Sequence, residues 1–161
     1  MIRYYLKNPD WSLEHATAGA SGYDLRAAPG EGNDRTLNPG QRFVACTDLH
    51  LEMPRGVEAQ VRSRSGLSLH HGIVVLNAPG TIDSDYRGEV KVTLINLSDT
   101  PWVMKHGDRI AQLVFAPVLP EYHEMLQGPG KFSAMEIRRV PTLAMFGLTD
   151  RGASGHGSTG R

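Results

Sequence analysis

Two carboxylates and a tyrosine lie close together in residues 80–88, Gly-Thr-Ile-Asp-Ser-Asp-Tyr-Arg-Gly. A glycine at each end and the turn-prone Asp83-Ser84-Asp85 predict a hairpin, which Glu89 to Ile95 leaves as a strand. A tight turn fixes side chains better than a long loop does, so this stretch suits a general base and an aromatic wall around a small substrate. Carboxylates that only cap their own turn would give the same pattern.

Two further stretches carry groups that suit an anion. In Arg62-Ser63-Arg64-Ser65-Gly66-Leu67-Ser68, arginines and serines alternate directly after a predicted strand. Guanidinium groups and hydroxyls in that order favour phosphate or carboxylate binding, although a solvated strand end is an equally good interpretation. Gly107 to Leu113 predicts a turn that enters a strand, on which Gln112 would be a surface residue.

Residues 151–161 form a glycine-rich tail with Arg151 and Arg161 at its ends. Its glycines satisfy the spacing G-x-G-x-x-G, but that fingerprint needs a helix after it and none is expected here. A P-loop is excluded because its lysine is missing. Backbone amides, hydroxyls and arginines on a free arm suit phosphate oxygens, and a disordered terminus is the alternative.

The composition limits the class of protein. The 161 residues are enough for one domain with a real core, and Lys plus Arg equals Asp plus Glu at 17 each, which argues against a general nucleic-acid binder. Cys46 is the only cysteine, so no intramolecular disulfide or cysteine-built zinc site is expected. Without a long apolar run we expect no signal peptide and no membrane span, and a soluble, cytoplasmic protein.

Apolar residues alternate with polar ones instead of recurring at helical spacing, which predicts half-buried strands. Eighteen glycines and ten prolines separate the runs and predict frequent turns. Many short strands with frequent turns favour an all-β sandwich or barrel. The predicted strands include Phe43–Ala45, Val57–Arg62, Ile73–Leu76, Val90–Leu94 and Ile110–Ala116.

The organisation follows from these patterns. Residues 1–150 are expected to form a single β-rich domain, and residues 151–161 a flexible arm. Within the domain, residues 121–150 fit the strand pattern least well and are expected to be a surface segment. Ser133 to Val140 could form one short helix there, since Ser133 and Glu136 make a weak capping box. The pair His70-His71 is expected to be solvated or packed, because adjacent strand residues point to opposite faces.

Taken in order along the chain, five stretches resemble the five motifs of the trimeric dUTPases, the deoxyuridine triphosphate nucleotidohydrolases. The resemblance implies a jelly-roll-like (β-clip) subunit, a homotrimer, and active sites at the subunit interfaces. It also implies magnesium-assisted hydrolysis of dUTP to dUMP and pyrophosphate, which supplies dUMP for thymidylate synthesis and keeps uracil out of DNA. The matching stretches are Ala20–Ala27, Arg64–Ser68, Gly80–Gly88, Gly107–Leu113 and Arg151–Gly160.

The resemblance also assigns roles to residues. Asp83 would be the general base that deprotonates the attacking water, and Tyr86 would pack against the sugar and leave no room for a 2′-hydroxyl. The uracil edge would be bound by the hairpin backbone and its neighbours, Asn77, Gly80, Thr81 and Ile82. The phosphates would be bound by Arg64, Ser65, Gly66 and Gln112 and by the arm residues Arg151, Ser158 and Thr159.

Magnesium, the implied cofactor, would be held mainly by phosphate oxygens, with Asp24 helping through water. The arm departs from the family pattern, because Ser154 replaces a glycine and His156 replaces the phenylalanine that stacks on uracil. An imidazole can also stack, so His156 and its neighbour Gly157 are expected to contact the base.

Two other functions remain open from the sequence. One is a relative of the dCTP deaminases, which share the fold, and release of ammonia from dCTP would distinguish it. The other is a non-catalytic trimeric scaffold that binds an unknown protein partner through residues 121–150. The expected partners are otherwise dUTP and further copies of the chain, with no nucleic acid and no membrane.

Overall fold

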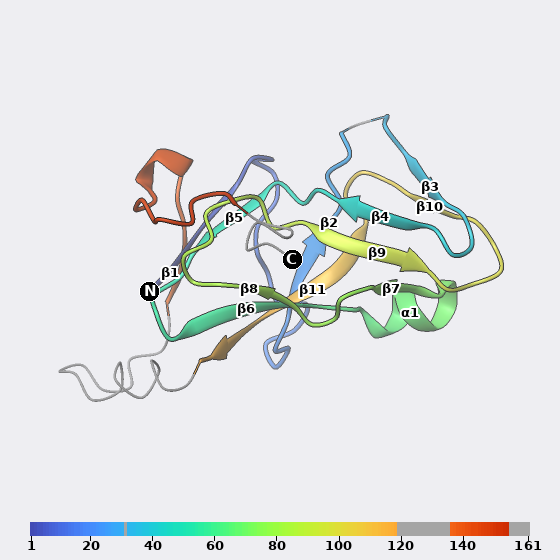
Figure 1. Ribbon diagram of the computed structural model, residues 1–161, viewed down its shortest axis with the longest axis horizontal. Helices are drawn as coiled ribbons and strands as arrows, with labels where there is room; N and C mark the ends of the chain where they lie inside the picture. Colours follow the sequence, from blue (N-terminus) through green and yellow to red (C-terminus); the bar gives the residue numbers. More distant parts are fainter. Residues whose placement is uncertain (31, 119–135, 155–161) are drawn as a thin grey trace.

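The structure is a computed structural model of the 161-residue chain, and it describes residues 1–30, 32–118 and 136–154 (Figure 1). These residues are mostly β-strand, with one short α-helix, α1 (Ser65–His71), and one 3-10 turn, η1 (Leu143–Met145). The strands are β1 (Ile2–Leu6), β2 (Tyr23–Arg26), β3 (Arg35–Leu37), β4 (Arg42–Ala45), β5 (Leu49–Glu52), β6 (Val57–Arg62), β7 (Ile73–Val75), β8 (Gly80–Ile82), β9 (Val92–Asn96), β10 (Trp102–Met104), β11 (Arg109–Pro117) and β12 (Ile137–Arg139).

Within the described ranges the strands form small sheets in the orders β2-β11-β6-β8, β4-β9-β7, β12-β1-β5 and β10-β3. All pairs are antiparallel except β1 with β12. Figure 1 shows β8 beside β6, and the sheet order places β11 on the other side of β6. The all-β, jelly-roll-like prediction is therefore confirmed.

The core lies where the predicted alternation places it. In β6, Val57, Ala59 and Val61 are buried while the residues between them are half-buried, and β9 repeats the pattern. Each large apolar side chain that is removed from water contributes roughly 1.5–3 kcal/mol to folding. The same alternation in β9 and the residues before it leaves Glu89, Lys91 and Thr93 on the face opposite the core, the face that lines a pocket.

The helix α1 was not predicted, because the sequence argument treated its first residues as a strand end and His70-His71 as part of a strand. The placement in a strand is wrong, because both histidines occupy the last turn of α1, but both are exposed, as expected of a solvated pair. None of the helix residues is buried, so no apolar stripe was present to reveal it. Gly72 ends the helix with φ 64°, a left-handed conformation that glycine adopts without strain. No helix in the described part of the chain is long and apolar enough to span a membrane.

The prediction of a short helix over residues 133–140 is also wrong for the part of that range that the structure describes, because Ile137–Arg139 form the strand β12. This strand pairs in parallel with β1, and Val140 directly after it is 2% exposed. Residues 137–140 are therefore attached to β1. Residues 121–135, half of the predicted surface segment 121–150, lie outside the described residues.

Candidate active site

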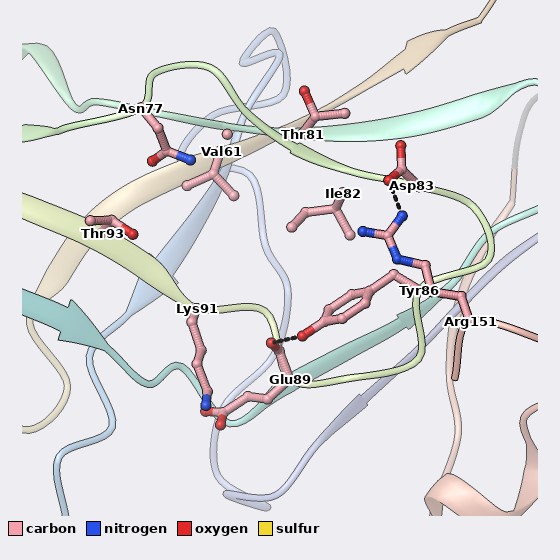
Figure 2. A pocket seen from close by; sticks show the side chains of 11 residues that line it. Val61, Asn77, Thr81, Ile82, Asp83, Tyr86, Glu89, Lys91, Thr93 and Arg151 are labelled. Carbon is pink, nitrogen blue, oxygen red and sulfur yellow. Dashed lines mark hydrogen bonds and ion pairs between the residues drawn. The ribbon is translucent and has the colours of Figure 1, made fainter. Parts of the chain in front are cut away.

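A small pocket of about 160 Å³ opens beside the hairpin that carries Asp83 (Figure 2). Its walls come from β6, from the segment that runs through β8 into the hairpin, from the strand that leaves the hairpin, and from the start of the C-terminal arm. The lining residues are Val61, Asn77, Gly80, Thr81, Ile82, Asp83, Tyr86, Glu89, Lys91, Thr93 and Arg151.

Strand pairing sets one side of this pocket. In the ladder between β8 and β6, Gly80 lies opposite Val61, and Ile82 lies opposite Ala59. A Cβ atom on Gly80 would come within 3.3 Å of Asn77 Nδ2 and 3.4 Å of Val61 Cβ. The glycine therefore lets the Asn77 amide lie close against the strand, so that it can present hydrogen-bonding groups to a ligand.

The hairpin turn places its two carboxylates differently. The backbone N–H of Tyr86 donates to the Asp83 carbonyl at 3.1 Å, which closes the turn. In Figure 2 the Asp83 side chain lies at the mouth of the pocket, where the Arg151 guanidinium forms an ion pair with it. Asp85 does not line the pocket, and its carboxylate is 3.6 Å from the same guanidinium.

Arg151 also lies over the aromatic ring of the hairpin. Its Cζ atom is 5.6 Å from the centroid of the Tyr86 ring, a cation–π arrangement. The hydrogen bond to Asp83 raises the pKa of Arg151, despite opposing desolvation, and the Asp83 and Asp85 charges add to the rise. The guanidinium is therefore a fixed positive charge at the pocket mouth.

The Tyr86 side chain is 9% exposed and forms one wall. Its hydroxyl donates to the Glu89 carbonyl oxygen at 3.0 Å. Burial raises the pKa of Tyr86, and the charge of Glu89 raises it further, while Arg151 lowers it. The phenol therefore stays neutral and keeps its proton as the hydrogen-bond donor.

The first residues of the arm are fastened to this hairpin. The Arg87 backbone N–H donates to the Gly152 carbonyl at 2.7 Å, and Arg87 Nε donates to the Gly147 carbonyl at 3.1 Å. Thr149 Oγ1 donates to the Asp85 carbonyl at 2.6 Å. These bonds hold the segment on either side of Arg151 and so place its guanidinium over Asp83.

A second polar cluster, the arginine cluster of Asp24, Arg64 and Arg109, lies at the other end of β6. Asp24 Oδ1 accepts from Arg64 Nε at 2.9 Å, and Asp24 Oδ2 accepts from Arg109 Nη1 at 3.2 Å. The register places Gln112 of β11 between Asp24 of β2 and Arg62 of β6. Gln112 is half-buried, and its Nε2 donates to the Ser63 carbonyl at 2.9 Å.

The predicted site residues are thus divided between two places. Asn77, Gly80, Thr81, Ile82, Asp83, Tyr86 and Arg151 line the pocket, whereas Asp24, Arg64, Ser65, Gly66 and Gln112 do not. Ile82 lies opposite Ala59 and Gln112 lies opposite Arg62, so these two residues are offset by about 10 Å along β6 at ~3.3 Å per residue, whereas Gly80 lies opposite Val61, the neighbour of Arg62. The predicted contacts His156, Gly157, Ser158 and Thr159 lie outside the described residues.

Sequence reasoning missed several residues that the structure places in these groups. Glu89, Lys91 and Thr93 line the pocket, and the polar half of the alternation around Val90 and Val92 was the signal that could have revealed them. Arg109 was noted only as part of a motif, although it holds Asp24 together with Arg64. The sequence contained little indication of this role for Arg109, because an exposed arginine at the start of a strand has many possible partners.

Solved dUTPases share this fold. The structure of the Streptococcus mutans dUTPase matches with a TM-score of 0.63 at 29% identity, over 72% of this chain and 95% of its own. A point-mutant dUTPase from phage phi11 of S. aureus matches with a TM-score of 0.65 at 21% identity, over 84% of this chain and 97% of its own. That structure is described as showing the coordination of a structural Mg(II) ion.

Sequence comparison identifies the family directly. The dUTPase family model matches residues 11–130. The deoxyuridine 5′-triphosphate nucleotidohydrolase of Brucella melitensis biotype 2 is 47% identical over 157 residues, which cover 92% of this chain and 89% of the relative. The chain belongs to the dUTPase family.

Proposed function

We propose that this protein hydrolyses dUTP to dUMP and pyrophosphate, with Asp83 as the general base. The observation that carries the proposal is the position of the Asp83 carboxylate at the mouth of a pocket walled by Tyr86, in a chain of the dUTPase family. The 47% identity to a protein named deoxyuridine 5′-triphosphate nucleotidohydrolase supports the same reaction. In the cytoplasm, the product dUMP would feed thymidylate synthesis.

In the chemical step, Asp83 accepts a proton from a water molecule, whose oxygen attacks the α-phosphorus. The bond from that phosphorus to the bridging oxygen breaks, and pyrophosphate leaves with the electron pair. A positioned base of this kind contributes roughly 10²- to 10⁴-fold in rate. Because Arg151 pairs with Asp83 here, the step requires the guanidinium to turn from the carboxylate to the phosphates of the substrate.

The pocket would hold the nucleoside. The Asn77 amide and the backbone of Gly80 to Ile82, which line the pocket, would bond the edge of uracil, and cytosine would present the wrong donors and acceptors. Thymine would be excluded by its methyl group, which needs space against β8. The Tyr86 ring would pack on the deoxyribose and exclude a 2′-hydroxyl.

The phosphates would be held by the arginine cluster and by the arm. Arg64 and Gln112 present a charged and a neutral donor near the exposed Ser65 and Gly66 at the start of α1. Because these residues lie away from the pocket of their own chain, we propose that the cluster of one subunit faces the pocket of another in a homotrimer. The arm residues His156 to Thr159 are proposed to complete that site, and a protein partner for residues 121–150 stays a prediction.

Magnesium fits this arrangement only as an ion that arrives with the triphosphate. No group of three His, Cys, Asp or Glu side chains in the described ranges could hold a metal ion by itself, and both Asp24 oxygens already bond arginines. Asp24 retains lone pairs that suit a contact through water. When bound, the ion would neutralise charge on the phosphates.

The test is pyrophosphate release with magnesium from dUTP, dTTP, dCTP and UTP, with ammonia release from dCTP measured in parallel. We expect release from dUTP alone and its loss in Asp83→Asn. Ammonia from dCTP would identify a deaminase instead. If folded protein acts on none of the four nucleotides, the catalytic proposal is wrong and a binding scaffold remains.

A further inference from the structure

The Tyr86 ring rests directly on Gly88, and no side chain fits between them. A Cβ atom on Gly88 would lie 2.4 Å from Tyr86 Oη, 2.5 Å from Cζ and 2.9 Å from Cε2. All three are atoms of one rigid aromatic group, so none can move aside without the whole ring. Gly88 is not among the glycines with positive φ, so the ring, not the backbone conformation, excludes a larger residue there.

The hydroxyl end of the ring, which rests on Gly88, is also held by Glu89. The Tyr86 hydroxyl donates to the Glu89 carbonyl, whose residue is itself clamped by the loop between β4 and β5. Glu89 Oε1 accepts from the backbone N–H groups of Thr47 and Asp48, each at 2.9 Å. Next to it, the Val90 N–H donates to the Leu49 carbonyl at 2.7 Å. The carbonyl that receives the phenol is therefore fixed to the body of the subunit.

We infer that Gly88 and Glu89 are positioning residues that set the selectivity for deoxyribose over ribose by fixing the depth of the Tyr86 ring. The inference rests on the proposed function, in which that ring packs on the sugar. A hydroxyl is excluded only by a wall that does not yield, because a shift of about 1 Å already changes the fit of a reacting substrate greatly. The selectivity for deoxyribose over ribose therefore depends on the residues that support the Tyr86 ring as much as on the ring itself.

A methyl group on Gly88 gives a directional result. It lifts the ring from its support and breaks the hydrogen bond to Glu89, and a lifted ring occupies space that the deoxyribose needs. Productive binding then requires the ring to swing away from the sugar. A ring in that position no longer blocks a 2′-hydroxyl sterically. Gly88→Ala should therefore lower kcat/KM for dUTP and lower the dUTP-to-UTP ratio of kcat/KM about tenfold.

The matched control is Gly19→Ala, because a Cβ atom at Gly19 meets nothing within 4 Å. It should leave the ratio unchanged. The decisive comparison repeats Gly88→Ala in a Tyr86→Ala background, where no ring remains to be lifted and the substitution should not change the ratio further. The inference would be overturned if Gly88→Ala changed the dUTP-to-UTP ratio equally in both backgrounds. It would also be overturned if Gly88→Ala left the ratio at the wild-type value when Tyr86 is present.

A second pair of variants tests the support without any clash. Glu89→Ala removes the acceptor for the Thr47 and Asp48 amides and should lower the ratio, whereas Glu89→Gln keeps an amide oxygen there and should largely retain it. Equal ratios for the two variants would contradict the proposed support. The inference fails separately from the proposed function, since a wild type that releases no pyrophosphate from dUTP rejects the reaction itself.

Discussion

The hairpin pocket and the arginine cluster hold their carboxylates in opposite ways. In the pocket, Asp83 is 48% exposed at its side chain and, among the residues that the structure describes, its carboxylate pairs only with Arg151 of the arm. In the cluster, the side chain of Asp24 is 20% exposed and bonded through both oxygens, to Arg64 and Arg109. One carboxylate is accessible to solvent and substrate, while the other is committed to fixing two cations.

This difference indicates that the two carboxylates have different roles. A base must be able to accept a proton, so its carboxylate needs an open side and a partner that can leave. A carboxylate that only orients guanidinium groups works best when both oxygens are bonded, since Arg presents a rigid fork of donors. The difference agrees with the proposed roles, in which the pocket carries out the chemistry beside a nucleoside and the cluster holds phosphate.

The largest effect that tests this comparison is expected at Asp83. Asp83→Asn removes the proton acceptor while it keeps the shape, so kcat should fall roughly 10²- to 10⁴-fold with KM for dUTP little changed. Asp85→Asn is the matched control, because Asp85 shares the turn and not the pocket. Steady-state pyrophosphate release measures both, and a larger loss from Asp85→Asn would reverse the assignment.

A smaller effect is expected in the arginine cluster. Arg64→Met should raise KM and lower kcat/KM for dUTP by about 10- to 100-fold, the value of a charge-assisted hydrogen bond of ~1.5–3 kcal/mol. Arg62→Met is the control, since the Arg62 side chain is exposed and bonds only Gln60 among the described residues. Equal losses from the two variants would mean that general positive charge, and not the cluster, holds the phosphates.

The smallest expected effect concerns stability at Asp48, beneath the strand that leaves the hairpin. Burial raises the pKa of Asp48 and the charge of Glu89 also raises it, while Lys7 and two histidines lower it. A raised carboxyl pKa means that the folded state disfavours the charge, so stability is lost as pH rises above the unfolded value of about 3.9.

Asp48→Asn should therefore raise Tm at pH 7 by ~1–3 °C, and the gain should vanish below about pH 4, where both states of the wild type are protonated. Thermal unfolding at the two pH values measures it, with the exposed Asp34→Asn as the control. A variant that is less stable at pH 7 would contradict this expectation and show that the Asp48 charge supports the fold.

The sequence alone predicted the parts of the fold whose pattern is local. The predicted strand Val57–Arg62 coincides with β6 because every second residue enters the core. The short strand β12 has one apolar residue and pairs with β1 at the opposite end of the chain, so its formation depends on tertiary contact. The helix α1 buries none of its residues and left only Gly72 as a stop signal.

Most residues that line the pocket were predicted together from the sequence, but their arrangement was not. Asp83 and Tyr86 share one turn, so their proximity follows from the sequence. That Arg64 lies apart from them depends on the register of β6 with β8 and β11, which no single segment encodes. The contact of Arg151 with Asp83 likewise depends on the bonds that fasten the arm to the hairpin.

In the proposed homotrimer, a complete site combines the pocket of one subunit with the arginine cluster of another. The most direct measurement mixes two impaired variants, Asp83→Asn and Arg64→Met, by unfolding them together in equal amounts and refolding. If the two residues act from different subunits, about a quarter of the sites should have both intact, and pyrophosphate release should recover to that fraction of wild type. If the mixture stays as impaired as its components, both residues act within one chain and the claim is wrong.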